Sequence, residues 1–255
     1  MNPSRYSRAL RAPLTAALLA LVTLLSACAT PGTTSAGGDP FESVNRKVYA
    51  FNDAVDNAVI KPVAQGYKAV VPRPVRTCVG NFFGNMSDAW STVNSCLQGK
   101  GGECAQNFMR VATNTVFGIA GCIDIASSIP GLERKSEDFG QTLAVWGVPS
   151  GPFVMLPLFG PSTVRDTGGL IVGTYADPLG YIFDDEWYWG LTALRIISLR
   201  ADLLDASNLL DGAALDRYSF IRDAYIQRRN SQVYDGNPPD TPQPDEAPYS
   251  NNPQK

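Results

Sequence analysis

Four cysteines in the middle of the chain constrain its fold more than any other feature. Cys78 lies 18 residues before Cys96, and Cys104 lies 18 residues before Cys122. Eighteen residues make about five turns of α-helix, so the members of each pair share one helix face if the helix is unbroken. Residues 98–102, Gln-Gly-Lys-Gly-Gly, separate the pairs and are typical of a turn. The pattern predicts two antiparallel helices joined by this turn.

An antiparallel hairpin of this kind determines which cysteines can pair. Residues that face each other across two antiparallel helices have a constant sum of residue numbers. That sum is 200 both for Cys96 with Cys104 and for Cys78 with Cys122. We therefore predict two nested disulfides, about 27 Å apart along the helices. A metal or redox site would need the four cysteines together and reduced, which this spacing does not favour. We expect no metal site.

The N-terminus has the pattern of an exported, lipidated protein. Three arginines precede an apolar run at residues 14–25, which is too short to cross a hydrocarbon core of about 30 Å as a helix. Residues 1–27 are therefore expected to be a signal peptide. Residues 25–28, Leu-Ser-Ala-Cys, look like a bacterial lipobox, so we expect Cys28 to carry acyl chains. An ordinary secretory signal with a chance cysteine is the alternative. Ala29, and not Asp, follows the cysteine, which by resemblance to sorted lipoproteins favours the outer membrane.

Composition excludes several function classes. The chain has no histidine, which removes Ser-His and Cys-His catalytic pairs and histidine-assisted zinc sites. Cleavage of the signal peptide removes three arginines and no acid, leaving 18 Lys and Arg against 24 Asp and Glu in 228 residues. A formal charge of -6 does not suit binding to nucleic acid. Residues 99–102 lack the spacing and the hydroxyl residue of a phosphate-binding loop. We expect neither an enzyme nor a cofactor.

Helix signals dominate the rest of the chain. Residues 39–42, Asp-Pro-Phe-Glu, resemble an N-cap with Pro at the first helical position, and the apolar spacing that follows predicts a helix to about Val59. A second apolar stripe predicts a helix over residues 187–204. A last helix is expected over residues 213–229, where two final arginines suit the negative end of the helix dipole.

The domain boundaries follow from composition. Six prolines among the last 26 residues predict a disordered tail over residues 230–255. Residues 28–38 are expected to be a flexible tether, and residues 39–229 a single helical domain.

Two segments, 116–126 and 151–161, are strongly apolar yet broken by Gly and Pro, so neither could span a membrane as one helix. Buried core connections would explain each of them alone. A chain tethered to a bilayer, however, gains from placing such segments in one leaflet, and the Trp-Tyr-Trp run at residues 187–189 is typical of an interfacial belt. Together they favour a monotopic protein.

An ordered set of motifs resembles the MlaA (VacJ-like) lipoprotein family over about residues 39–229. These motifs are Asp39-Pro40-Phe41-Glu42, Asn45-Arg46, Tyr49-Ala50-Phe51-Asn52, Pro62-Val63-Ala64, Val71-Pro72-Arg73-Pro74-Val75-Arg76, Asn81-Phe82-Phe83-Gly84-Asn85, Asp138-Phe139-Gly140-Gln141-Thr142-Leu143, Trp146-Gly147-Val148, Gly151-Pro152-Phe153, Leu156-Pro157 and Arg165-Asp166. The four further cysteines and the Pro-rich tail are additions to the family pattern.

The resemblance implies an all-α, ring-shaped monotopic protein in one leaflet of the outer membrane, with an amphipathic channel and short Gly/Pro-rich loops. It implies removal of mislocalised phospholipids from the outer leaflet. It also implies two protein partners, a trimeric outer-membrane porin and a soluble periplasmic phospholipid carrier. The chain would lie at the periplasmic face of the outer membrane of a Gram-negative bacterium, held by its lipid anchor.

The resemblance also implies a flexible loop beside the channel. It corresponds to Gly147, Val148, Pro149, Ser150 and Gly151. Pro149 stands where a glycine is also common, which puts the extent of hinge motion in question. Candidates for lining the lipid passage are Phe153, Leu156, Arg165 and Asp166. An ion pair that fastens two helices is an equally good interpretation of Arg165 and Asp166.

Two other function classes stay open at this point. One is a structural lipoprotein that organises porins without lipid transfer. The other is a lipid hydrolase that uses Ser or Asp without His, which release of lysophospholipid by the pure protein would reveal. The lipid preferred and the direction of transport do not follow from the sequence.

Overall fold

A computed structural model describes residues 39–213 and 216–239. Its helices and strands, in chain order, are α2 (Glu42–Val55), a π-helical turn (Asp56–Ile60), α3 (Lys61–Val70), α4 (Arg73–Leu97), α5 (Gly101–Val116), a 3-10 turn (Ala126–Ser128), α6 (Phe139–Val145), β1 (Phe153–Leu156), β2 (Gly160–Thr163), α7 (Val164–Tyr175), α8 (Leu179–Ile182), α9 (Asp185–Ala213) and α10 (Arg217–Val233). The expected signal peptide, the lipidation site Cys28 and the tether lie outside the described residues.

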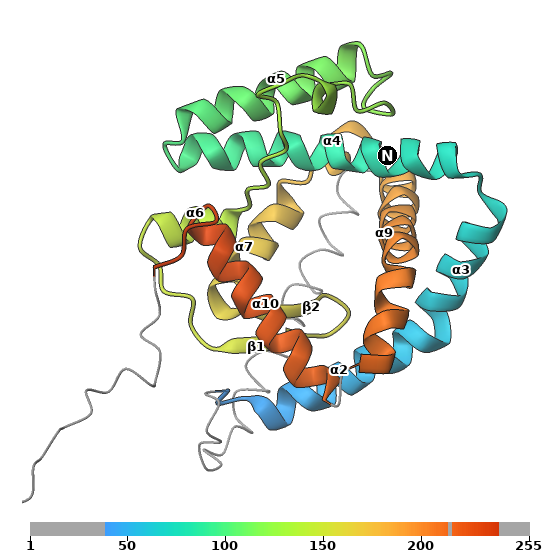
Figure 1. The fold of residues 1–255 in the computed structure, drawn as a ribbon, viewed down its shortest axis with the longest axis vertical. Coiled ribbons are helices and arrows are strands. Elements are labelled where there is room, and N and C mark those ends of the chain that lie inside the picture. Colours follow the sequence, from blue (N-terminus) through green and yellow to red (C-terminus); the bar gives the residue numbers. More distant parts are fainter. Residues whose placement is uncertain (1–38, 214–215, 240–255) are drawn as a thin grey trace, which may run out of the picture.

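These elements follow one another around a ring when the molecule is viewed down its shortest axis (Figure 1). Helix α3 packs on α9, α9 on α4, and α4 on α6, which in turn packs on α7. Helix α10 contacts α6 and β2, while β1 contacts α2. The predominantly helical ring agrees with the fold class expected from the resemblance.

The cysteine hairpin is confirmed. Helices α4 and α5 lie side by side along one edge of the ring, and disulfides join Cys96 to Cys104 and Cys78 to Cys122 (Figure 1). The assumption of two unbroken helices was wrong at the outer bridge. Helix α5 ends at Val116, and Cys122 lies in the turns that follow it. The pairing rule still holds because those turns fold back against the start of α4.

The start of the first described helix differs from the prediction. Phe41 occupies the N-cap of α2 without a side-chain cap, and Asp39 instead accepts hydrogen bonds from the Phe41 N–H and the Asn45 side chain. The helical path also continues past Val59, because a π-helical turn leads directly into α3. Pro62 lies directly after this π-helical turn, and because proline has no N–H, one hydrogen bond of the continuous helical path is absent there.

The last two helices are longer or shifted relative to the predictions. Helix α9 runs to Ala213 rather than ending near residue 204. Helix α10 begins at Arg217, after the Asp216 N-cap, and runs to Val233, so the first residues of the expected tail are helical. Residues 240–255 of that tail lie outside the described residues.

The apolar segment at residues 151–161, interpreted from the sequence as a buried connection or as part of one leaflet, forms most of a two-stranded hairpin. Strands β1 and β2 pair antiparallel, with Phe153 opposite Thr163 and Leu156 opposite Gly160. The glycine at the tip has φ of +83°, a conformation that suits the tight connection. The segment at 116–126 instead consists of turns between α5 and the 3-10 turn.

The distribution of polar and apolar residues is inverted relative to a soluble helical protein. The interface of α4 and α5 buries at least six polar side chains at 1% exposure or less, which are Asn85, Asp88, Asn94, Asn107, Arg110 and Asn114. Large apolar side chains are more than half exposed around the ring, among them Phe51, Val116, Phe117, Ile119, Trp187, Trp189 and Leu199. Within the described part of the chain, no helix combines the length and hydropathy needed to cross a bilayer.

Candidate functional site

Helices α6 and α7 cross where two glycines let their backbones approach closely. A Cβ atom on Gly169 would lie 2.5 Å from the backbone nitrogen of Gly140. A Cβ atom on Gly140 would lie 2.3 Å from Nη2 of Arg229 and 2.6 Å from Oδ1 of Asp166. Neither glycine can therefore carry a side chain without a shift of its neighbours. The glycine of the Asp-Phe-Gly-Gln motif makes room for a guanidinium group.

Arg229 of α10 enters this crossing and joins three helices. Its Nη1 and Nη2 donate to the carboxylate oxygens of Asp138 at 2.6 and 2.7 Å, and Nη2 also donates to Oδ1 of Asp166 at 2.8 Å. Arg165 donates from Nε to the same Asp166 oxygen at 3.0 Å, and the Tyr225 hydroxyl donates to Oδ2 at 2.8 Å. Arg165, Asp166 and Arg229 are each less than 9% exposed. The cluster fastens α10 to α6 and α7.

Burial of Asp166 opposes its ionisation, but hydrogen bonding to Arg229 and the charge of that guanidinium outweigh burial and lower the pKa of the Asp166 carboxyl. Burial also opposes the charge of Arg229, and the bonds to Asp138 and Asp166 raise the pKa of the guanidinium despite it. Burial raises the pKa of the Tyr225 hydroxyl, which the Asp166 charge raises further. The Asp166 carboxylate and the Arg229 guanidinium therefore form a charged pair at neutral pH.

Two of the residues predicted to line the lipid passage, Arg165 and Asp166, are buried in this cluster. Arg165 and Asp166 do form an ion pair, at 3.0 Å, but both lie on α7. The ion pair that links two helices is that of Asp166 with Arg229 of α10. Sequence reasoning had assigned Arg229 to the dipole at the end of a helix. Because α10 continues for four residues beyond it, Arg229 lies inside the helix and points into the crossing.

The loop at residues 147–151 begins with a helix-ending turn. The Val148 N–H bonds to the Leu143 carbonyl at 2.9 Å and the Gly147 N–H to the Ala144 carbonyl at 2.9 Å, with Gly147 at φ +87°. These two bonds and the left-handed glycine form a Schellman cap for α6. Gly147, Val148 and Pro149 are exposed.

The other end of the loop is attached to the start of α7. The Arg165 N–H bonds to the Ser150 carbonyl at 3.1 Å, and the Val164 N–H bonds to the Pro152 carbonyl at 3.2 Å. Gly151 has φ of +69°, and a Cβ atom there would lie 3.1 Å from Cβ of Val164. Both glycines therefore have packing or conformational roles that do not depend on motion.

Asn45 and Asn52 hold the β-hairpin against α2, and sequence reasoning gave them no role. The Asn45 amide donates to the Phe153 carbonyl at 3.2 Å and accepts from the Met155 N–H at 2.8 Å. Asn52, seven residues later on the same helix face, repeats the pattern on Leu156 and Leu158 at 2.9 and 2.8 Å. Two side chains thus take the place of a third strand. The spacing of seven between two asparagines was the available signal.

Phe153 lies in a buried cluster with Met155 of β1 and Tyr218 of α10. Its ring centroid is 6.3 Å from that of Tyr218 and 6.0 Å from that of Tyr225. Leu156 is only partly buried, while Leu158 and Phe159 at the hairpin tip are 63% and 64% exposed. The exposed apolar surface of this segment is therefore at the tip and not at Phe153.

Residues 37–232 match the model of a family described as MlaA lipoprotein. The chain belongs to the MlaA lipoprotein family. It is 38% identical over 214 residues to the intermembrane phospholipid transport system lipoprotein MlaA of Escherichia coli strain K12, which covers 82% of this chain and 84% of that protein. It is 31% identical over 229 residues to MlaA of Haemophilus influenzae, over 88% of this chain and 90% of that protein.

A similar fold is also found among solved structures. One, described as the structural basis for maintenance of bacterial outer membrane lipid asymmetry, is 36% identical and has a TM-score of 0.67, covering 78% of this chain and 100% of that chain. Some of the residues on which the resemblance rests lie at the places described above: Asp138, Gly140 and Asp166 at the α6–α7 crossing, and Asn45 and Asn52 at the hairpin. In this MlaA-family chain they close the ring.

Proposed function

We propose that this protein removes mislocalised phospholipids from the outer leaflet of the outer membrane and passes them to a soluble periplasmic carrier. The observation that supports this proposal most is the inverted ring, polar inside the α4–α5 interface and apolar on its outside. Membership of the MlaA family supplies the link to phospholipid transport.

The physical requirement for such transport is a polar route for the lipid headgroup. Moving an unpaired charged headgroup through hydrocarbon is the costly step, whereas the acyl chains are already in a suitable solvent. An amphipathic channel through the ring would lower that cost without any bond being made or broken. We therefore propose a passive route, with no nucleophile, metal or cofactor taking part in it.

The proposed location is the periplasmic face of the outer membrane. Acyl chains on Cys28 would provide stable attachment, which apolar surface alone does not. The exposed apolar side chains of the ring would then lie in the inner leaflet. We propose a trimeric porin and a soluble phospholipid carrier as the two protein partners, as the family resemblance implies.

The experiment compares three strains of a Gram-negative host that lacks its own MlaA-family protein: one with an empty vector, one with this chain, and one with its Cys28→Ala variant. Phospholipid in the outer leaflet is measured as the fraction that an added phospholipase can reach on intact cells. We expect the wild-type chain alone to lower this fraction. A wild-type chain that co-purifies with porin and leaves the fraction unchanged would favour a structural lipoprotein, and lysophospholipid released by the pure protein would favour a hydrolase.

A further inference from the structure

The two disulfides of the α4–α5 hairpin differ in exposure and in the length of chain that they enclose. Cys96 is exposed and pairs with Cys104 eight residues later, whereas Cys78 and Cys122 are both partly buried and lie 44 residues apart. An exposed disulfide is the one that an added thiol reaches more easily. A short loop also constrains the unfolded chain less, so the fold loses less stability when that bond is broken. The Cys96–Cys104 bond is therefore the one that can open while the fold persists.

The turn that this bond encloses has two sides of different intrinsic stability. On the α4 side, the Gly99 N–H bonds to the Cys96 carbonyl and the Lys100 N–H to the Ser95 carbonyl, both at 3.0 Å, with Gly99 at φ +75°. These bonds form a Schellman cap that ends α4 without the disulfide. On the α5 side, the N-cap residue Lys100 makes no side-chain cap, and the helix starts with two glycines. The first turn of α5 therefore depends on the disulfide more than the end of α4 does.

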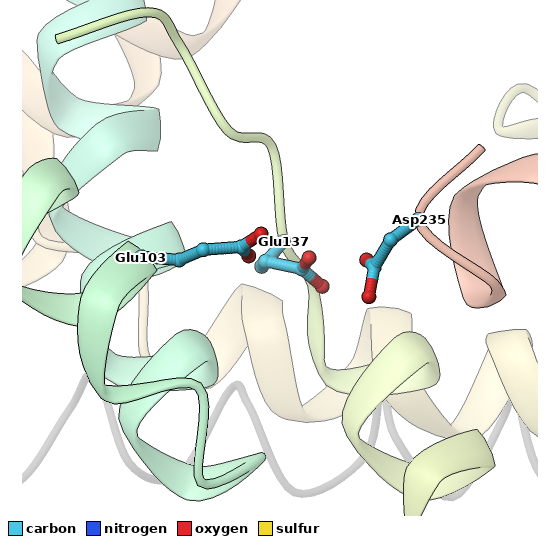
Figure 2. A group of neighbouring side chains, drawn as sticks. All are labelled: Glu103, Glu137 and Asp235. Carbon is cyan, nitrogen blue, oxygen red and sulfur yellow. The ribbon is translucent and has the colours of Figure 1, made fainter. Parts of the chain in front are cut away.

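Lys100, at this junction, ties the turn to two distant segments. Its Nζ lies 3.1 Å from Oε1 of Glu137, which precedes α6, and 2.5 Å from Oδ1 of Asp235, which follows α10. Figure 2 shows the two carboxylates that Lys100 joins. Gln98 donates to the other Glu137 oxygen at 2.8 Å, from the side of the turn that the Schellman cap holds. Asp235 has Lys100 as its only ion-pair partner among the described residues, so its attachment to the turn depends on Lys100.

Helix α10 closes the ring, and Asp235 lies just beyond its end. Helix α10 contacts α6 and β2, and Arg229 within it bonds to Asp138 at the α6–α7 crossing. The Lys100–Asp235 pair is a second tie, in a turn where Asp235 and Gly236 have φ of +52° and +87°. Local opening costs least at the end of a helix. Loss of this second tie would therefore release the segment after α10 without opening the first tie.

We propose that the Cys96–Cys104 disulfide is a redox-sensitive latch between the α4–α5 turn and the end of α10. With the bond formed, the start of α5 is fixed and Lys100 is held against Asp235. With the bond reduced, the first turn of α5 loosens, the Lys100–Asp235 pair weakens and the segment after α10 opens. The Arg229 cluster and the other disulfide keep the rest of the ring assembled. This latch goes beyond the proposed lipid transport and does not depend on it.

The reductant of such a latch is a dithiol. One thiolate of the dithiol attacks the exposed Cys96 sulfur, the S–S bond breaks, and the Cys104 sulfur leaves and takes up a proton. The second thiol of the dithiol then releases Cys96 as a thiol and closes a disulfide within the reductant. The protein gains two electrons and two protons, and the dithiol is oxidised. In an oxidising compartment the latched form is the resting state.

The first test treats the lipidated full chain in detergent with increasing dithiothreitol, blocks free thiols with iodoacetamide and maps the peptides by mass spectrometry. We expect Cys96 and Cys104 to be alkylated at concentrations that leave Cys78 and Cys122 paired. In these selectively reduced samples, hydrogen exchange at residues 233–237 should be about two- to fivefold faster, the factor for loss of one partly exposed ion pair, and unchanged in α7. Simultaneous reduction of the two disulfides, unchanged exchange at 233–237, or faster exchange throughout the molecule would each overturn the latch.

Lys100→Met tests whether the disulfide acts through the ammonium group. We expect fast exchange at residues 233–237 in the oxidised variant and no further rise after reduction. The double variant Cys96→Ser, Cys104→Ser should exchange like the reduced wild type and should not respond to dithiothreitol. The matched control Lys135→Met removes an exposed lysine from the pocket that Glu137 and Asp235 line, and it should respond to reduction like the wild type. A full response to reduction in Lys100→Met, or slow exchange in the double variant, would contradict the proposal.

Discussion

Arg229 shows how one residue can decide the closure of the ring. Its guanidinium is the only group described at the crossing that contacts both Asp138 and Asp166. A buried ion pair of this kind adds little stability over a well-packed apolar core, but loss of one partner leaves the other charge without compensation. The main effect of removing Arg229 is therefore the loss of compensation for buried negative charge, and not the loss of the hydrogen-bond energy itself.

We expect Arg229→Met to lower the free energy of unfolding by about 3 kcal/mol, because Asp166 would stay buried with Arg165 as its one remaining cation and α10 would lose its link to Asp138. The adjacent Arg228 is exposed, so Arg228→Met is a control with the same change in charge and should stay near the wild type. Denaturant unfolding of both variants in detergent provides the measurement. Equal effects of the two changes would show that α10 is held by something other than the Arg229 cluster.

Asp124 gives a prediction for pH dependence. Burial would raise the pKa of this carboxyl, but hydrogen bonds from Ser127 and Asn114 prevail and lower it to about 2. An aspartate with a depressed pKa stabilises the folded state above the unfolded pKa of about 4 and loses that contribution as pH falls.

We expect Asp124→Asn to be less stable than the wild type at pH 6, with the difference shrinking as the pH falls from about 4 to about 2. Thermal unfolding midpoints across this range provide the measurement. Asp205→Asn removes an exposed carboxylate paired with Lys68 and serves as the control. A difference that stays constant with pH would contradict the role of the Asp124 charge.

At the scale of single elements, the β-hairpin depends on α2 for hydrogen bonds that a third strand would otherwise make. Asn45 is 3% exposed, and it is the partner of the buried Met155 N–H. We expect Asn45→Ala to lower the free energy of unfolding by about 1 to 3 kcal/mol, because a buried donor loses its acceptor. Asn57→Ala, an exposed asparagine that bonds only to Asp53 in the described contacts, should cost much less. Similar losses for the two variants would contradict the hairpin argument.

The loop at residues 147–151 has glycines with structural roles, so their substitution should have a different effect from substitution in a simple hinge. Gly147 caps α6 in a left-handed conformation and Gly151 lies against Val164, so we expect Gly147→Val, Gly151→Val to destabilise the protein by about 1 to 2 kcal/mol per residue and to lower its abundance. Protein level, porin co-purification and outer-leaflet phospholipid should be measured together. A variant of normal abundance that binds porin but fails to remove phospholipid would show that the loop moves during transport.

At the scale of the whole molecule, features that depend on residue spacing could be predicted from the sequence. Features that depend on tertiary contacts could not. The cysteine spacing predicted both disulfides, because pairing along a hairpin depends only on residue number. The partner of Asp166 on another helix could not be predicted, because Arg229 lies 63 residues away and its approach depends on the glycine crossing. The apolar runs were recognised, but their shape as turns or hairpin depends on contacts with α2 and α4. Residue periodicity alone contains no information on these contacts.

The exposed apolar surface of the ring also bears on the lipid anchor proposed at Cys28. Apolar side chains such as Phe117 and Trp189 are about 70% exposed, and they provide a surface with affinity for a bilayer. The two or more acyl chains proposed for Cys28 would make attachment stable, which such a surface alone does not. The net charge of the mature chain adds no attraction to anionic lipid.

We therefore expect Cys28→Ala to keep its fold and both disulfides but to leave the membrane fraction during a mild wash. Fractionation of cells before and after the wash provides the measurement, and outer-leaflet phospholipid should rise at the same time. Some residual association is expected, because the apolar surface of the ring remains. A variant that stays membrane-bound as firmly as the wild type would show that the ring, and not the acyl chains, is the anchor.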